Sequence, residues 1–301
     1  LPINLITRVG AVKWSLACRR RARGAGADGS KGAGPGRWRR ANDKSRSRRR
    51  PGCKLTVVIR ATYPCTMCSA WKTPADAPEL AADEVHVWRL DLEDAVADDA
   101  CLSPDERERA GRIAAQRHRQ RFVAARSALR CLLAQYLGCE PAEVAFAYGE
   151  HGKPTLQEGD LCFNLSHSHE MALYAVARAR AVGVDVEWPR PKVAHEQIAE
   201  RFFSLEEREA LSAVATPEKK AAFYNIWTRK EAYIKARGDG ITAGLDTFGV
   251  SLGAEAALVH SDEGQAELAR WRLQALDPAP GYVAALCAEG AWRLRCLRCR
   301  A

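Results

Sequence analysis

The sequence lacks the features that assign a chain to a membrane or to the secretory route. It has no run of about eighteen apolar residues, so no segment is suited to span a bilayer. Its N-terminal segment has neither a clean apolar stretch nor a small-residue cleavage site, which argues against a secretory signal. The eleven cysteines are odd in number and without framework spacing. We therefore expect reduced thiols in a cytoplasmic protein with no membrane contact.

Methionine is also scarce. Only two occur in 301 residues, the first of them is Met67, and the chain begins with leucine. Residues 1–66 carry 17 Lys and Arg against two Asp, a net charge of +15, and residues 19–51 are rich in Arg, Gly, Ala and Ser. Such a composition cannot bury enough apolar surface to fold. We expect residues 1–66 to be a basic, low-complexity extension that is disordered or results from a misplaced start.

Acidic side chains outnumber basic ones in the rest of the chain. Residues 67–301 hold 29 basic and 35 acidic side chains, a net charge of −6, so the formal +9 of the chain comes from its N-terminal segment. A nucleic-acid binder is an alternative only if that segment is real, because the phosphate contacts would have to come from there. We expect no specific nucleic-acid partner.

Two Cys-x-x-Cys pairs raise the question of a zinc site. Cys65 with Cys68 and Cys296 with Cys299 could supply four thiolates. Their separation is far outside the spacing of compact zinc fingers, and the first pair straddles the suspected start. We therefore expect no zinc site.

Strand and helix patterns follow one another from residue 84 onward without strict alternation, which is typical of an α+β fold. Ser103 and Pro104 begin a long helical stretch that Gly138 ends. Residues 171–177 and 181–187 predict a hairpin. Further strands are expected at 84–92, 144–148, 161–166, 248–252, 271–275, 282–287 and 292–297, and further helices at 195–200, 204–213 and 223–235.

The segment 223–235 has apolar residues at a helical period and is followed by a Gly-Asp-Gly breaker at 238–240, so it predicts an amphipathic helix. On this helix Glu231 lies one turn before Lys235. Taken alone, a Glu and a Lys at this spacing indicate an ordinary surface ion pair.

A second acidic pair lies in the strand pattern at 182–187. Asp185 and Glu187 project from one face of that strand, and Val184 and Val186 project from the other. Two carboxylates side by side repel each other unless a cation lies between them, and Mg²⁺ prefers such oxygen ligands. The alternative is a strand with a solvated acidic face.

A glycine, two spaced acids and, about forty residues later, Trp-x-x-Lys-Glu-Ala-x-x-Lys form a composite motif. This motif resembles the signature of the 4'-phosphopantetheinyl transferases, and most closely that of the surfactin-synthetase-activator type. Further pieces follow in the family's order: His-Gly-Lys-Pro at 151–154, Phe-Asn-Leu-Ser-His-Ser at 163–168, and Arg-Phe-Phe-Ser at 201–204 with Glu206 and Glu207. The resemblance covers roughly residues 85 to 290.

The resemblance implies a fold of two similar α+β halves forming a pseudo-dimer, which we place at residues 84–187 and 188–301. It implies transfer of the 4'-phosphopantetheine group of coenzyme A onto a serine of an apo acyl or peptidyl carrier protein, with release of 3',5'-ADP. Such an enzyme depends on Mg²⁺, although Mn²⁺ could replace it, and we expect a monomer.

The resemblance also implies roles for single residues. Asp185, Glu187 and Glu231 would hold the metal, and Glu231 and Lys235 would be catalytic. Coenzyme A would be bound through Arg109, Arg121, Lys153, Pro154, Ser166, His167 and Lys235. Adjacent Ser and His could also suggest nucleophilic catalysis, but neighbours on a strand point to opposite faces and cannot readily pair.

Several alternatives stay open at the level of sequence. Glu231 could be a metal ligand or the base that deprotonates the serine. Glu207 fits a capping box with Ser204 as well as it fits a functional role. Fatty-acid, polyketide and nonribosomal peptide carriers would all suit. A carrier-binding relative without activity is a further alternative, but it would have no need for the proposed metal and catalytic residues together.

Overall fold

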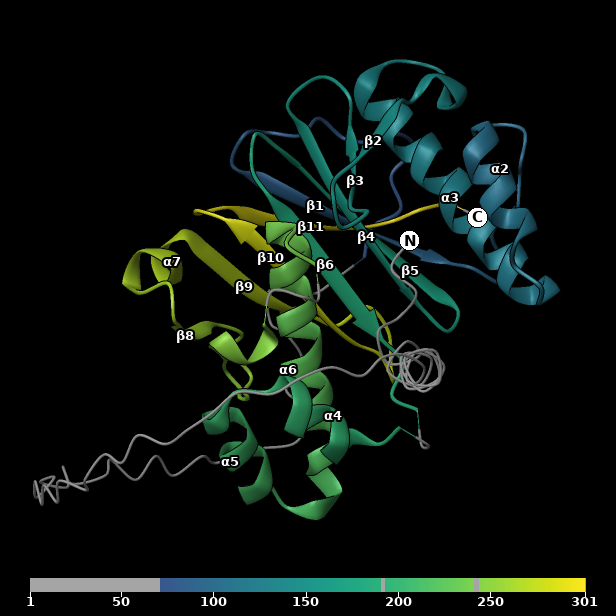
Figure 1. Ribbon diagram of the computed structural model, residues 1–301. Coiled ribbons are helices and arrows are strands. Elements are labelled where there is room, and N and C mark those ends of the chain that lie inside the picture. Colours follow the sequence, from purple (N-terminus) through teal and green to yellow (C-terminus); the bar gives the residue numbers. More distant parts are fainter. Residues whose placement is uncertain (1–70, 191–192, 241–243, 301) are drawn as a thin grey trace, which may run out of the picture. The chain divides into compact units, whose positions relative to one another are not determined.

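The computed structural model describes residues 71–190, 193–240 and 244–300 (Figure 1). The predictions for residues 1–66, and the pair Cys65 and Cys68, lie outside the described residues. Within the described part, no helix is long and apolar enough to cross a membrane. Six described cysteines are free, but Cys296 is disulfide-bonded, so the expectation of reduced thiols is wrong for that residue.

A four-stranded sheet has the strand order β11-β1-β5-β4. Its strands are β1 (Glu84–Asp91), β4 (Leu161–Ser168), β5 (Met171–Arg178) and β11 (Arg293–Arg298). β5 pairs with β1 and β4 in antiparallel fashion, whereas β11 lies parallel to β1. The C-terminal strand therefore completes a sheet whose other strands come from the first half of the described chain.

A second sheet has the order β6-β10-β9, with β6 (Val182–Glu187), β9 (Trp271–Leu276) and β10 (Val283–Glu289) all antiparallel to their neighbours. The predicted hairpin of residues 171–177 with 181–187 is wrong, because β5 and β6 belong to different sheets. Two short ribbons pair β2 (Phe146–Tyr148) with β3 (Pro154–Leu156), and β7 (Phe248–Val250) with β8 (Leu258–Ser261).

Helices accompany the sheets, and the mixture confirms the α+β class. They are α2 (Pro104–Gly111), α3 (Gln116–Leu137), α4 (His195–Phe202), α5 (Leu205–Ala213), α6 (Thr216–Arg237) and α7 (Gln265–Arg270), with 3-10 turns η1 (Pro141–Glu143) and η3 (Leu245–Thr247). The predicted long helical stretch is two helices, since residues 112–115 interrupt it. Its predicted end is confirmed by Gly138, which is left-handed with φ 68°.

Side-chain alternation gives the four-stranded sheet two buried faces. Trp88 and Tyr174 pack with Leu129 of α3 on one face, and the Tyr174 hydroxyl donates to the Ala125 carbonyl at 2.9 Å. Val87, one residue from Trp88, packs with residues of the second sheet on the other face. The two sheets thus share a core, and α6 packs across β6 and β10 (Figure 1). The repeat of two halves stays a prediction.

Contact between α6 and β6 is unusually close at Gly183. A Cβ atom there would lie 2.1 Å from the Ala232 carbonyl oxygen and 2.3 Å from the Ala236 nitrogen. Only a residue without a side chain lets the helix backbone come this near to the strand. Gly183 therefore sets the distance between the two elements that carry the acidic pair and the Glu-Lys pair.

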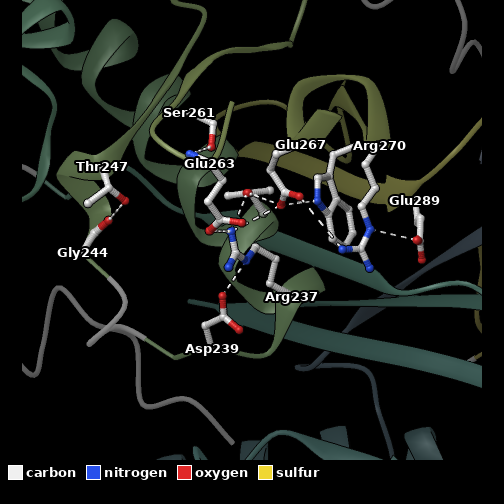
Figure 2. A network of polar contacts seen from close by, with 11 residues as sticks. Arg237, Asp239, Gly244, Thr247, Ser261, Glu263, Glu267, Arg270 and Glu289 are labelled. Carbon is white, nitrogen blue, oxygen red and sulfur yellow. Dashed lines mark hydrogen bonds and ion pairs between the residues drawn. The ribbon is translucent and has the colours of Figure 1, made fainter. Parts of the chain in front are cut away.

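The C-terminal end of α6 is held by a network of charged side chains around Arg237 (Figure 2). The Arg237 guanidinium forms ion pairs with Asp239, Glu263 and Glu267, and it donates to the Tyr233 hydroxyl at 3.0 Å. Glu267 of α7 also accepts from the Trp271 ring nitrogen at 2.6 Å. These contacts join the end of α6 to α7 and the turn before it.

We expect Arg237→Met to lower the free energy of unfolding by about 1 kcal/mol, since the Arg237 side chain is only 25% exposed but its partners are partly solvated. The loss should shrink at high salt, where partly exposed ion pairs are screened. Urea unfolding of both proteins at low and high salt measures it. An equal loss at both salt concentrations would mean that packing, not charge, is what Arg237 contributes.

Candidate active site

The predicted face of β6 is confirmed by the structure. Asp185 and Glu187 both lie on the face that Gly183 turns towards α6, and they are 4% and 2% exposed. The alternative of a solvated acidic face is excluded by this burial. Val184 and Val186 point into the core that the two sheets share.

Lys235 of α6 meets Asp185 across this interface. Its Nζ lies 2.6 Å from Asp185 Oδ1 and donates to the Ser166 hydroxyl at 3.1 Å. The simple surface pair of Glu231 with Lys235 is therefore wrong: the lysine side chain is only 11% exposed, and its ion-pair partner is on another element. Burial alone would lower the pKa of Lys235, but the charges of Asp185 and Glu231 outweigh it and raise that pKa.

Glu231 lies one turn earlier on α6 and is 7% exposed. Its Oε1 is buried and has no hydrogen-bond partner in the structure. Burial raises the pKa of Glu231 to about 7, against the opposing charge of Lys235 and with a further rise from Asp185. Burial likewise raises the pKa of Asp185, while Lys235 and Ser166 oppose the rise. Two carboxyl groups that resist ionisation thus share one ammonium group.

Ser166 and His167 point to different sides of β4, as expected for neighbours on a strand. Ser166 donates to Asp185 Oδ1 at 2.8 Å. Burial, with the charge of Lys235 as the next cause, lowers the pKa of His167 to about 4, and its Nδ1 has no hydrogen-bond partner. His167 is therefore a neutral imidazole at neutral pH.

The remaining residues proposed for coenzyme A have protein partners of their own. Arg121 of α3 forms ion pairs with Glu93 and Glu170, each at 3.2 Å. The Arg109 guanidinium lies 5.8 Å from the centre of the Phe122 ring. The ion-pair partners of Arg121 are thus carboxylates other than those of β6.

Lys153 and Pro154 lie at the start of β3. Lys153 Nζ donates to the Ala236 carbonyl at 2.9 Å, near the C-terminal end of α6, and burial lowers its pKa to about 8. Pro154 is buried. Lys153 thus binds the end of the helix that carries Lys235.

Glu207 has the capping role that the sequence left open. The Ser204 backbone N–H donates to Glu207 Oε2 at 2.9 Å, and the Ser204 hydroxyl accepts from the Glu207 N–H at 3.3 Å. Sequence reasoning missed its second partner, Lys230, whose Nζ lies 2.8 Å from the same carboxylate. Lys230 is fully buried and also donates to the carbonyls of Leu245 and Phe248. The lysine before Glu231 therefore holds α6 in place.

The acidic side chains of β6 and α6 offer oxygen atoms to a metal ion. No group of three His, Cys, Asp or Glu side chains in the described part is placed to hold one by itself. Asp185 Oδ2 and Glu231 Oε1, however, are buried oxygens without partners. Mg²⁺ often takes one or two protein carboxylates and completes its shell with water and substrate phosphates. The donor set fits a site of that kind.

Comparisons with known proteins decide the family. The model of the 4'-phosphopantetheinyl transferase superfamily matches residues 181–287, and that of the 4'-phosphopantetheinyl transferase N-terminal region matches residues 86–179. The 4'-phosphopantetheinyl transferase HetI of Nostoc sp. is 41% identical over 220 residues, which cover 70% of this chain and 90% of that protein. The chain belongs to the 4'-phosphopantetheinyl transferase superfamily.

Two further proteins that the chain resembles have lower sequence identity. The transferase Sfp of Bacillus subtilis is 29% identical over 194 residues, covering 62% of this chain and 82% of Sfp. The solved ACPS-CoA complex from Chronobacterium ammoniagenes is 23% identical with a TM-score of 0.28, over 38% of this chain and all of that one. The residues matched by the two family models adjoin between β5 and β6, where the chain passes from one sheet to the other.

Proposed function

We propose that this phosphopantetheinyl transferase moves the 4'-phosphopantetheine group of coenzyme A onto a serine of an apo acyl or peptidyl carrier protein. The observation that carries the proposal is that Asp185 of β6 lies with Glu231 and Lys235 of α6 at the interface of this strand and this helix. The chain that places them there belongs to this family. A bond forms between the serine oxygen and the phosphorus that bears the pantetheine arm. The bond from that phosphorus to the bridging oxygen breaks, and 3',5'-ADP leaves with the electron pair.

Lys235 and Glu231 are the proposed catalytic residues. Lys235 keeps its proton, because neighbouring carboxylates raise its pKa, and it would place a fixed positive charge beside the pyrophosphate. Glu231 would accept the serine proton, since a carboxylate with a pKa raised to about 7 is a better base than an ordinary one. If Glu231 binds the metal instead, the proton passes to water, and metal-binding measurements on Glu231→Gln separate the two roles.

Asp185, Glu187 and Glu231 are the proposed ligands of Mg²⁺, or of Mn²⁺ in its place. The two partnerless carboxylate oxygens support this proposal. When bound, the ion supplies positive charge that neutralises the pyrophosphate and favours departure of the leaving group.

Coenzyme A would be held at its phosphates by His167 and Lys235, with Arg109, Arg121, Lys153 and Pro154 as further contacts. Ser166, whose proton goes to Asp185, would act by holding Lys235 in place. His167, being neutral, would contribute a hydrogen bond and not a charge. Arg121 would exchange its present carboxylate partners for a phosphate, which its planar guanidinium can bind with two hydrogen bonds. The monomeric state, the cytoplasmic location and the lack of a specific nucleic-acid partner stay predictions.

Intact-mass measurement on an apo carrier protein tests the function. With the full chain, coenzyme A and Mg²⁺, the carrier is expected to gain the mass of one phosphopantetheine, and EDTA should abolish the gain. Lys235→Met should slow transfer by roughly 100-fold or more, because it removes a buried charge at the reacting phosphates. Lys219→Met, at the other end of α6, is the matched control and should transfer normally. A folded protein that modifies no carrier of any type would instead be a carrier-binding relative without activity.

A further inference from the structure

β4 and β6 face each other as edge strands of two different sheets. β6 pairs with β10 along one edge only, and the described residues form no backbone ladder between β6 and β4. Successive N–H groups of a strand point to opposite edges, so every second N–H of β6 points away from β10. Buried N–H groups of this kind need acceptors from elsewhere.

Three side chains of β4 supply those acceptors. Asn164 Oδ1 accepts from the Val184 N–H at 2.9 Å. The Ser166 hydroxyl accepts from the Val186 N–H at 3.3 Å, and the Ser168 hydroxyl accepts from the Trp188 N–H at 3.1 Å. The three residues alternate along β4 and are at most 5% exposed. A ladder of side chains thus joins the two sheets where a backbone ladder is missing.

The two serines of this ladder have a second contact that the asparagine lacks. Ser166 donates its proton to Asp185 Oδ1 at 2.8 Å, and Ser168 donates to Glu187 Oε2 at 2.9 Å. A hydroxyl has a single proton to donate, so these bonds commit the donor of each serine to a carboxylate. Each serine therefore fixes one carboxylate relative to the backbone of the strand that carries it.

We propose that Ser166 and Ser168 are positioning residues that orient Asp185 and Glu187 to hold a divalent cation. The proposal rests on the proposed function and concerns the geometry of its metal ligands. Ser166 and Lys235 both bind Asp185 Oδ1, which leaves Oδ2 as the buried oxygen without a partner. The serine thereby selects which oxygen is available to the cation. Outer-shell hydrogen bonds of this kind align metal ligands and tune their affinity.

Ser168 is the residue to test, because the Ser166 hydroxyl also contacts the proposed catalytic residue Lys235. We expect Ser168→Ala to weaken binding of Mn²⁺ by roughly 10-fold to 100-fold, which is typical for loss of an outer-shell partner. Mn²⁺ binding is measured by electron paramagnetic resonance on the full chain, without and with coenzyme A. Ser168→Thr keeps the hydroxyl and should recover most of the affinity.

Asn164→Ala is the matched control, because it removes a contact of the same ladder that touches no carboxylate. It should destabilise the protein towards urea about as much as Ser168→Ala does, yet bind Mn²⁺ like the wild type. A folded Ser168→Ala protein with wild-type Mn²⁺ affinity would overturn the positioning role, and so would a wild type that binds no Mn²⁺ with or without coenzyme A. If the wild type transfers phosphopantetheine and only the positioning test fails, the proposed function stands. If Mn²⁺ binding depends on Ser168 but no carrier is modified, the function fails and the positioning role stands.

Discussion

Glu231→Gln is expected to slow phosphopantetheine transfer by roughly 100-fold to 10,000-fold and, at the same time, to stabilise the metal-free protein above neutral pH. The loss of activity follows whether Glu231 binds the metal or accepts the serine proton. The gain in stability follows from burial. Glu231 has a buried oxygen without a partner, and its pKa is raised from 4.5 to about 7.

The direction of the pH effect follows from which state binds the Glu231 proton more tightly. The folded protein does, because its Glu231 pKa is the higher one. The stability from this proton is thus fully present below pH 4.5 and is lost as the pH rises through 7. Glutamine cannot ionise, so the variant keeps on the order of 2–3 kcal/mol of unfolding free energy that the wild type loses at high pH. An amide group without a hydrogen-bond partner would reduce this gain.

Urea unfolding in EDTA at about pH 4 and about pH 8 measures this difference. Wild type and Glu231→Gln should be nearly equal at the lower pH, and the variant should be more stable at the higher one. Glu209→Gln, an exposed position on α5, is the control and should change neither stability nor transfer. A variant that is less stable than the wild type at both pH values would show that the carboxylate is not the unfavourable group we take it to be.

Gly183→Ala is expected to lower the free energy of unfolding by more than about 3 kcal/mol or to prevent folding altogether. The new methyl group would lie 2.1 Å from the Ala232 carbonyl oxygen and 2.3 Å from the Ala236 nitrogen. Both are backbone atoms of α6, so no side-chain rotation can relieve the overlap. The helix would have to move away from β6, which would also separate Lys235 from Asp185.

Gly111→Ala is the matched control, because a Cβ atom at that glycine meets nothing within 4 Å. It lies at the end of α2 and should be neutral or slightly stabilising, since alanine favours helix more than glycine does. Urea unfolding and thermal denaturation of both variants measure the contrast. If Gly183→Ala folds with nearly wild-type stability, α6 does not lie as close to β6 as described, and the contact of Lys235 with Asp185 loses its support.

Local sequence determined the elements of the site and the faces of their residues. The alternation at 182–187 placed Asp185 and Glu187 on one side of a strand, because strand side chains alternate wherever the strand lies. Helical spacing placed Glu231 and Lys235 one turn apart for an equally local reason. Composite spacing of the motifs predicted the family, and the comparisons confirmed it.

Only the tertiary structure decided which elements meet. Lys235 could pair with Glu231 on its own helix, but burial and the approach allowed by Gly183 bring it to Asp185, 50 residues away. Whether residues 182–187 pair with the preceding strand or with β10 is also not a local property, since the alternation of side chains in a strand does not specify which strand it pairs with. The serine contacts of β4 exist only because two sheets meet edge to edge there, and no spacing in the sequence indicates that meeting.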